Sequence, residues 1–213
     1  MCKCRNISRW LDLILEPVYR AIAHTLTLLA YHPQSHGFEN IPATGAAVII
    51  SNHVSYMDGP IIDAMCKRRV RYVIDEDIYH LPAIHYFMKL ARAIPIAPNR
   101  KSVEEAFDTI SEGLKAGDLI CIFPEGFLTF TGGLGRFRSG VENIIKRDPV
   151  PIIPISISGL WGSVFSRKYR GSWKRLIPRD PRQPVIIKCG EALPPEGANV
   201  NSLQEAILRL KYS

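Results

Sequence analysis

The strongest chemical signal in this sequence is a histidine and an aspartate in one short polar stretch, His53 and Asp58. They follow an apolar run at residues 46–50, whose bounding turn residues predict a buried strand. His53 is therefore expected at the carboxyl end of a strand, where open α/β sheets bind their ligands. A carboxylate bonded to one ring nitrogen fixes the tautomer of the histidine, so this pair can act as a general base.

The same residues also allow a purely structural interpretation. Ser55 and Asp58 match a helix capping box, in which Asp58 only binds backbone amides and His53 is an ordinary loop residue. A second polar turn favours chemistry, because Glu125 and Gly126 follow another apolar run at residues 119–123. Two polar turns at the ends of two strands predict one shared site.

These stretches resemble the PlsC-type glycerolipid acyltransferases. The resemblance covers roughly residues 35–190, and its ordered blocks are Asn52-His53-x-Ser55-x-x-Asp58, Ile94 to Arg100, Phe123-Pro124-Glu125-Gly126 and Val150 to Ile155. It implies acyl transfer from acyl-CoA or acyl-carrier protein to the free hydroxyl of a lysophospholipid, with neither metal nor cofactor. It assigns His53 as the base and Asp58 as the residue that orients it. Arg100, Glu125 and Gly126 are expected at the glycerol-phosphate moiety.

Two departures from the family pattern concern the acceptor headgroup. The family commonly follows Glu-Gly with Thr-Arg-Ser, whereas residues 127–129 are Phe-Leu-Thr, so the family's arginine is missing unless Arg136 or Arg138 substitutes for it. An acidic segment at residues 75–77 stands where the family often has lysines. Residues 126–132 resemble the acyltransferase half of bifunctional enzymes that reacylate lysophosphatidylethanolamine. The acceptor is therefore expected to be of the 1-acylglycerol-3-phosphate or the lysophosphatidylethanolamine type.

The elements that must position these residues alternate along the chain. Apolar strand-like runs at residues 70–74, 94–96, 152–157 and 185–189 are separated by helical patterns, of which residues 102–115 and 202–212 both start at a Ser-x-x-Glu sequence. This alternation predicts an α/β fold, a two-layer or three-layer sandwich around a largely parallel central sheet. The 213 residues suit a single core. The five cysteines form no zinc-like pairs and fit a reducing compartment.

The first 34 residues are expected to form a separate amphipathic helical segment ahead of an acyltransferase domain at residues 35–213. Residues 7–31 read as one helix, or as two broken at Pro17, with a narrow polar stripe that includes Arg20 and His24. A broad apolar surface of this kind suits a helix that lies in a membrane interface, whereas in soluble proteins such a surface packs on the core. The expected location is the cytoplasmic face of a membrane.

Composition leaves other functions open. The chain has 27 Lys and Arg against 20 Asp and Glu, a net charge of +7, which favours an anionic partner. Basic and aromatic residues alternate between residues 161 and 182, a pattern that suits single-stranded nucleic acid, a bilayer surface or a solvated loop. A nucleic-acid-binding module leaves His53, Asp58 and Glu125 unexplained, so we expect no nucleic acid partner. A catalytically silent lipid-binding protein on the same fold is the other alternative.

Overall fold

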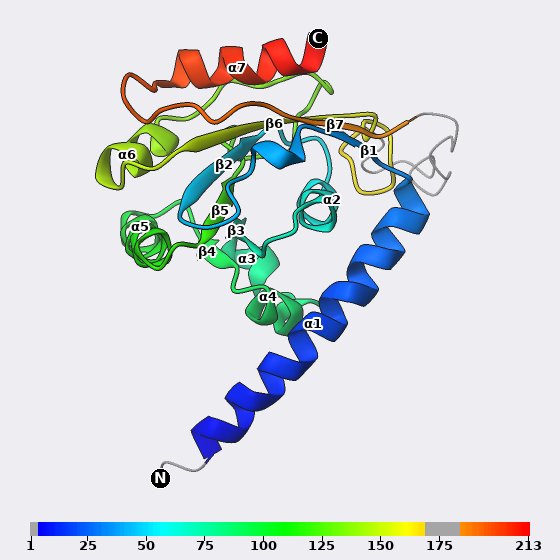
Figure 1. The fold of residues 1–213 in the computed structure, drawn as a ribbon, viewed down its shortest axis with the longest axis vertical. Helices are drawn as coiled ribbons and strands as arrows, with labels where there is room; N and C mark the ends of the chain where they lie inside the picture. Colours follow the sequence, from blue (N-terminus) through cyan, green and yellow to red (C-terminus); the bar gives the residue numbers. More distant parts are fainter. Residues whose placement is uncertain (1–3, 169–183) are drawn as a thin grey trace.

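The computed structural model describes residues 4–168 and 184–213, with side chains from residue 17 onward. Most of the basic and aromatic segment, residues 169–182, therefore lies outside the described residues. The described chain forms a twisted sheet covered by helices on both faces, with one long helix along its side (Figure 1).

The described residues form a sheet of seven strands in the order β1-β7-β6-β2-β5-β3-β4. All neighbouring pairs are parallel except β6 and β7, so β1 and β7 run against the other five. The strands are β1 (Gln34–His36), β2 (Ala47–Ser51), β3 (Val70–Asp75), β4 (Ile94–Ile96), β5 (Leu119–Ile122), β6 (Ile152–Ser158) and β7 (Ile186–Cys189). This arrangement confirms the predicted α/β fold with a largely parallel sheet.

Helices cover both faces of this sheet, which makes the fold a three-layer sandwich. On one face, α5 (Arg100–Lys115), α6 (Gly140–Arg147) and α7 (Val200–Tyr212) pack against alternate strand residues such as Val48 and Ile50. On the other face, α2 (Asp58–Met65) packs against the intervening residues, such as Ile49. Every residue of β2 is buried, because a central parallel strand faces a helical layer on each side. This explains why the run at residues 46–50 is continuously apolar.

Two helices begin upstream of the predicted positions. The predicted start of α5 at Ser102 is wrong, because the Asn99 side chain accepts from the Ser102 amide and the helix starts at Arg100. The predicted start of α7 at Ser202 is wrong for the same reason: Asn199 caps the helix, and the Ser202 hydroxyl lies in its capping box. In both helices an asparagine three residues earlier offers the carbonyl that a cap requires.

The N-terminal helix α1 (Cys4–Tyr31) is continuous through Pro17 and runs along the side of the body (Figure 1). It ends three residues before β1, so the division predicted at residue 34 falls at the start of the sheet; that division stays a prediction. Two short helices, α3 (Glu76–Tyr79) and α4 (His85–Leu90), lie near its middle, and the Tyr19 ring stacks on Phe87 at 4.9 Å. No helix in the described part of the chain is both long and apolar enough to cross a membrane.

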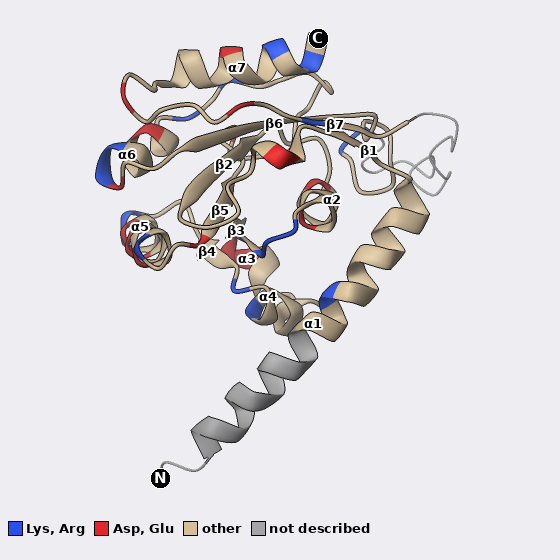
Figure 2. Cartoon of the chain, viewed as in Figure 1, with Lys and Arg blue, Asp and Glu red and all other residues tan. Residues whose placement is uncertain are grey.

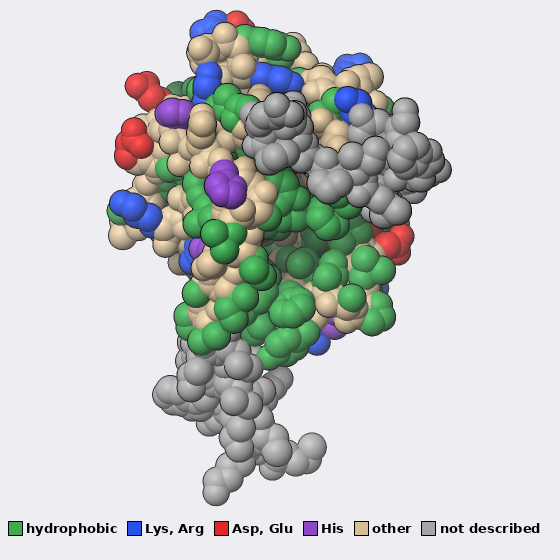
Figure 3. All heavy atoms as spheres, turned by 90° about the vertical axis from the view of Figure 1, so that its right-hand side faces the viewer, with side chains coloured by type: hydrophobic (Ala, Val, Ile, Leu, Met, Phe, Trp, Pro, Cys, Tyr) green, Lys and Arg blue, Asp and Glu red, His purple; other side chains and the backbone are tan. Residues whose placement is uncertain are grey.

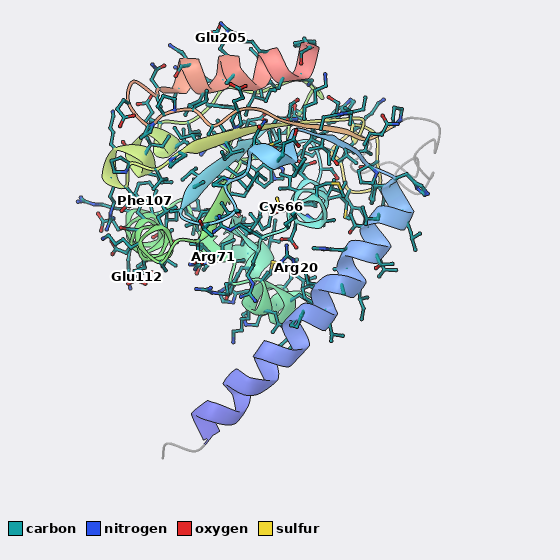
Figure 4. The ribbon with its side chains drawn as sticks, viewed as in Figure 1. Arg20, Cys66, Arg71, Phe107, Glu112 and Glu205 are labelled. Carbon is teal, nitrogen blue, oxygen red and sulfur yellow. The ribbon has the colours of Figure 1, made fainter. Side chains whose placement is uncertain are left out.

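The polar stripe of α1 faces the protein. Arg20 donates to Asp63 of α2 at 3.2 Å and to the carbonyl oxygens of Cys66 and Arg68, and His24 Nε2 lies 2.7 Å from the same carboxylate. Figure 4 shows Arg20 on the side of α1 that faces α2 and Cys66. Arg20 is also the one charged residue of α1 whose side chain is described (Figure 2). Polar contacts thus hold the helix to the body.

The opposite side of α1 is apolar and exposed. Val18, Ile22, Leu26 and Leu29 follow helical spacing, and each is more than half exposed. Figure 3, which views the right-hand side of Figure 1, shows hydrophobic side chains gathered over much of the centre and lower part of this face. Tyr86 and Phe87 of α4 add exposed aromatic surface. The helix therefore turns its apolar side away from the core.

Candidate active site

The stretch that contains His53 joins the end of β2 to the start of α2. β2 ends at Ser51, and Asp58 is the first residue of α2. His53 Nδ1 lies 2.8 Å from Asp58 Oδ2, so the turn folds the carboxylate back onto the imidazole. The ring is 17% exposed and its Nε2 atom has no hydrogen-bond partner among the described residues. The predicted pair is thus assembled with one ring nitrogen free for a substrate.

Asp58 orients His53 and also binds backbone amides, but it does not cap α2, whose N-cap residue is Met57. Its Oδ2 atom accepts three hydrogen bonds: from His53 Nδ1, from the Val54 amide at 2.6 Å and from the Ser55 amide at 2.9 Å. The capping box predicted for Ser55 and Asp58 does not form, because the Ser55 hydroxyl accepts from the Met57 amide rather than from that of Asp58 and the N-cap of α2 is Met57. Because the two amides can only donate to Oδ2, an ionised Asp58 places the ring hydrogen on Nδ1. Nε2 is then the basic nitrogen.

An aromatic ring fixes the plane of the imidazole. Phe123, directly after β5, stacks on His53 with a centroid distance of 4.1 Å and an interplanar angle of 15°. β5 is the neighbour of β2 in the sheet, so the two strand ends deliver the two rings side by side. Phe123 belongs to the block that carries Glu125, but the sequence assigned it no role.

Glu125 connects the two polar turns through their backbones. Its Oε1 accepts from the His53 amide at 2.8 Å, and its Oε2 accepts from the Gly135 amide at 2.7 Å. The side chain is fully buried, and this burial raises the pKa of the carboxyl group, although both backbone bonds oppose the shift. With both oxygens held by backbone donors, Glu125 positions the His53 turn. A contact of Glu125 with a glycerol hydroxyl stays a prediction.

Of the predicted arginines, Arg138 lies closest to this turn. The Arg138 amide donates to the Pro124 carbonyl at 2.8 Å, and its Nε atom would be 2.8 Å from a Cβ added to Gly126. Gly126 has a φ of 73°, in the left-handed region where glycine is favoured, and its missing side chain leaves room for the arginine. Arg138 thus lies against the Glu-Gly turn.

The other two predicted arginines are less closely tied to this turn. Arg100 begins α5 with its side chain 93% exposed and donates to Glu104 at 2.8 Å. It makes no hydrogen bond to Glu125 within the described part of the chain. Arg136 is exposed, and no described residue pairs with it. The roles of both at the acceptor headgroup stay predictions.

Asn52 holds the base of the turn and had no predicted role. Its side-chain amide donates to the Ile157 carbonyl at 2.9 Å and accepts from the Ile157 amide at 2.8 Å. This fully buried bridge joins the end of β2 to the end of β6, which carries the fourth family block. An asparagine directly between a strand and a candidate base was the available signal.

Comparisons with known proteins agree with this geometry. A family model described as acyltransferase matches residues 32–158, which include His53, Asp58, Arg100, Glu125 and Arg138. The chain is 26% identical to the chloroplast 1-acyl-sn-glycerol-3-phosphate acyltransferase of Arabidopsis thaliana, over 69% of this chain and 44% of that protein. It is 26% identical to the 1-acyl-sn-glycerol-3-phosphate acyltransferase of Pseudomonas aeruginosa, over 87% and 68%. It is also 26% identical to the N-acylphosphatidylethanolamine synthase of Arabidopsis thaliana, over 68% of this chain and 55% of that protein.

The chain spans about half the length of several of these curated relatives, including 38% of a second chloroplast acyltransferase, from Brassica napus. A crystal structure of PlsC from Thermotoga maritima shares the fold, with a TM-score of 0.67 at 22% identity over all of this chain and 81% of that one. This likeness agrees with the predicted resemblance to the PlsC-type enzymes. Because the family model matches more than half of the sequence, this chain belongs to the acyltransferase family.

Proposed function

We propose that this protein is an O-acyltransferase that moves a fatty acyl group from a thioester to the free hydroxyl of a lysophospholipid. The observation that carries the proposal is the His53–Asp58 pair, joined at 2.8 Å at the end of a central strand, with Nε2 open to a substrate. Relatives named as 1-acyl-sn-glycerol-3-phosphate acyltransferases support the substrate class. The donor is acyl-CoA or acyl-carrier protein.

His53 Nε2 takes the proton from the acceptor hydroxyl as its oxygen attacks the thioester carbonyl carbon. The tetrahedral adduct collapses by breaking its carbon–sulfur bond, and the protonated histidine returns the proton to the departing thiolate. Products are the acylated phospholipid and a free thiol, so the step needs no covalent enzyme intermediate. Asp58 holds the ring in its productive tautomer and stabilises the imidazolium that forms. Glu125 holds the turn through the His53 amide, and Asn52 holds it through Ile157 of β6.

Arg138 is the arginine that we propose for the phosphate of the acceptor. It lies against Gly126, beside the turn where the family places the glycerol phosphate, and no described carboxylate pairs with it. A guanidinium group can bind two phosphate oxygens with its planar set of donors. An acidic segment such as residues 75–77 can complement an amine headgroup, but Asp75 is engaged elsewhere, because it accepts from the Asp77 and Ile78 amides to cap α3. These contacts favour the phosphate rather than an amine as the recognised group.

We further propose that the exposed apolar side of α1 lies on the cytoplasmic face of a membrane. Val18, Ile22, Leu26 and Leu29 are 54% to 64% exposed, and burying them in lipid stabilises binding by roughly 4–7 kcal/mol. The polar side of the helix is engaged with α2, so the apolar side is free to contact lipid. A lysophospholipid acceptor is drawn from the same surface.

The first experiment measures labelled acyl transfer with acyl-CoA and acyl-carrier protein against a panel of lysophosphatidic acid and lysophosphatidylethanolamine. Thioester consumption that depends on a lysolipid and is lost in His53→Ala supports the enzyme. Lysolipid binding without transfer would instead identify a silent lipid-binding protein. Tight retention of oligonucleotides on a filter would favour the nucleic-acid alternative.

The second experiment measures sedimentation with anionic phospholipid vesicles. A triple Ile22→Ser, Leu26→Ser, Leu29→Ser variant should stay in solution, whereas Tyr212→Ser, which alters an exposed ring on α7, should sediment like the parent. Equal sedimentation of the triple variant and the parent would place the anchor outside α1.

A further inference from the structure

Two cations flank a pair of aromatic rings beside the candidate active site. The Arg138 guanidinium lies 5.4 Å from the centroid of Phe127, and Phe127 lies 5.4 Å from Phe130. The guanidinium carbon of Arg167, which follows β6, lies 4.4 Å from the centroid of the Phe130 ring. The four side chains form a ladder, and Phe130 is 67% exposed, so the ladder lies at the protein surface.

The segments that contain Phe130 and Arg167 are both bound to the turn that holds His53. The Thr129 amide, next to Phe130, donates to the His53 carbonyl at 2.8 Å. Ser166, next to Arg167, forms a β-bridge with Ser55, whose amide binds Asp58. Phe130 and Arg167 are therefore each one residue from a direct contact with this turn.

Arg167 is half-buried, and its Nε atom is a buried donor without an acceptor among the described residues. Its Nε atom is inaccessible to solvent and has no hydrogen-bond partner, and no carboxylate in the described ranges 17–168 and 184–213 pairs with its guanidinium. An unpaired buried donor on a charged group is costly, and natural proteins normally satisfy it. Stacking on Phe130 leaves the in-plane N–H groups of the two Nη atoms for a ligand, and their planar geometry matches two oxygens of a phosphate ester.

We propose that Arg167, held by Phe130, binds a phosphate ester of a substrate at the mouth of the active site. This contact is additional to that of Arg138 and rests on the proposed acyl transfer. Both reactants carry such a phosphate, the lysophospholipid in its headgroup and the donor in its phosphopantetheine arm. Because Arg138 lies at the Glu-Gly turn and Arg167 at the opposite end of the ladder, the two reactants can be held from two sides.

The test compares Arg167→Gln, Arg167→Lys and Phe130→Leu in the full chain, with Arg209→Gln as the control. Arg209 is an exposed arginine on α7 that pairs with Glu205, so its replacement should change the KM of neither substrate. KM is measured for the lysolipid at saturating acyl-CoA and for acyl-CoA at saturating lysolipid, with thermal unfolding of each variant as the measure of its fold. We expect Arg167→Gln to raise one KM by roughly ten- to a hundred-fold, the loss of a charged hydrogen bond, and to change kcat much less.

The substrate whose KM rises identifies the source of the phosphate. Arg167→Lys should raise the same KM by a smaller factor, because a lysine keeps the charge without the planar pair of donors. Phe130→Leu should act in the same direction, because it removes the ring that orients the guanidinium. If Arg167→Gln fails to fold, Arg167→Lys carries the comparison alone. Folded arginine variants with both KM values within twofold of the parent would overturn the proposal, even if their thermal stability falls.

A binding measurement separates this inference from the proposed reaction. Calorimetry with CoA and with glycerol 3-phosphate reports the phosphate site without any acyl transfer. Weakened binding of one of these ligands in Arg167→Gln supports the site, whether or not the parent transfers acyl groups. Unchanged binding of both ligands, measured with a parent that binds them, contradicts it.

Discussion

Replacing Asp58 by asparagine tests how the candidate base is held. Asp58 Oδ2 accepts three hydrogen bonds in a fully buried site, whereas Oδ1 has no hydrogen-bond partner among the described residues. Each bond to a charged acceptor contributes about 1 kcal/mol more than one to a neutral amide, so the three together lose about 3 kcal/mol. The new Nδ2 group takes the position of Oδ1 and has no acceptor there. We therefore expect Asp58→Asn to lower the free energy of unfolding by roughly 3–5 kcal/mol.

His53→Ala should be milder on stability and severe on activity. It removes one of the three bonds to Asp58 and the stacking on Phe123, and it leaves the two backbone amides on the carboxylate. The expected destabilisation is about 1–3 kcal/mol, whereas loss of a general base lowers turnover by about 10²–10⁴-fold. Asp58→Asn should lower turnover comparably, because the asparagine no longer fixes the tautomer of the ring or stabilises its charge.

The parent, the two single variants and the double variant form a double-mutant cycle. Turnover is measured with saturating substrates at a temperature well below each unfolding midpoint, and stability by denaturant titration. Asp108→Asn, which alters an exposed ion pair on α5, serves as the control and should match the parent in both. If Asp58 acts through His53, the double variant is no slower than His53→Ala. Losses that multiply, or a folded Asp58→Asn protein within tenfold of the parent, would refute the argument.

Three other predictions concern the Glu125 carboxyl group, the buried cysteine thiols and the Gly126 turn. Burial raises the pKa of Glu125 in the folded protein, so the stability that this carboxyl group contributes is present below its ordinary pKa and is lost as pH rises through the folded value. The difference in free energy of unfolding between the parent and Glu125→Gln, measured by denaturant titration, should therefore shrink as pH increases above about 4.5. Burial raises the pKa of Cys66 and of Cys189 to about 12 and that of Cys121 well above its ordinary value, so peptide mapping after iodoacetamide treatment of the native protein at pH 8 should find these three thiols unmodified, and modified after denaturation. Gly126→Ala places a methyl group against Arg138 at a left-handed φ, so it should lower the free energy of unfolding by about 1–2 kcal/mol and raise the KM for the lysolipid; an unchanged KM in the folded variant would separate Arg138 from the acceptor.

Local patterns were sufficient for six of the seven strands in the described sheet and for the position of the candidate base, but not for β1, an exposed three-residue edge strand without an apolar run. The run at residues 46–50 is apolar at every position because β2 is buried on both faces, and its abrupt polar end marks where the chain leaves the sheet. His53 and Asp58 are five residues apart, so a single turn brings them together. Signals of this kind depend on neighbours in sequence. The helix starts were less accurate, because Asn99 and Ser102 can each cap and only the backbone path decides between them.

Contacts between distant segments were beyond such patterns. A carboxylate such as Glu125 can bind any donor within reach, and its two partners, His53 and Gly135, depend on which strands are neighbours in the sheet. The ladder that ends in Arg167 likewise joins segments that follow β5 and β6.

The direction of α1 shows the same limit. Helical periodicity revealed one polar and one apolar side, but periodicity does not state which side meets the protein. Since Asp63 and two backbone carbonyls of the α2 region provide acceptors at the contact, Arg20 and His24 face inward. The aliphatic side is left outside because the acceptors for Arg20 and His24 lie on the body, and these acceptors come together only once the domain has folded.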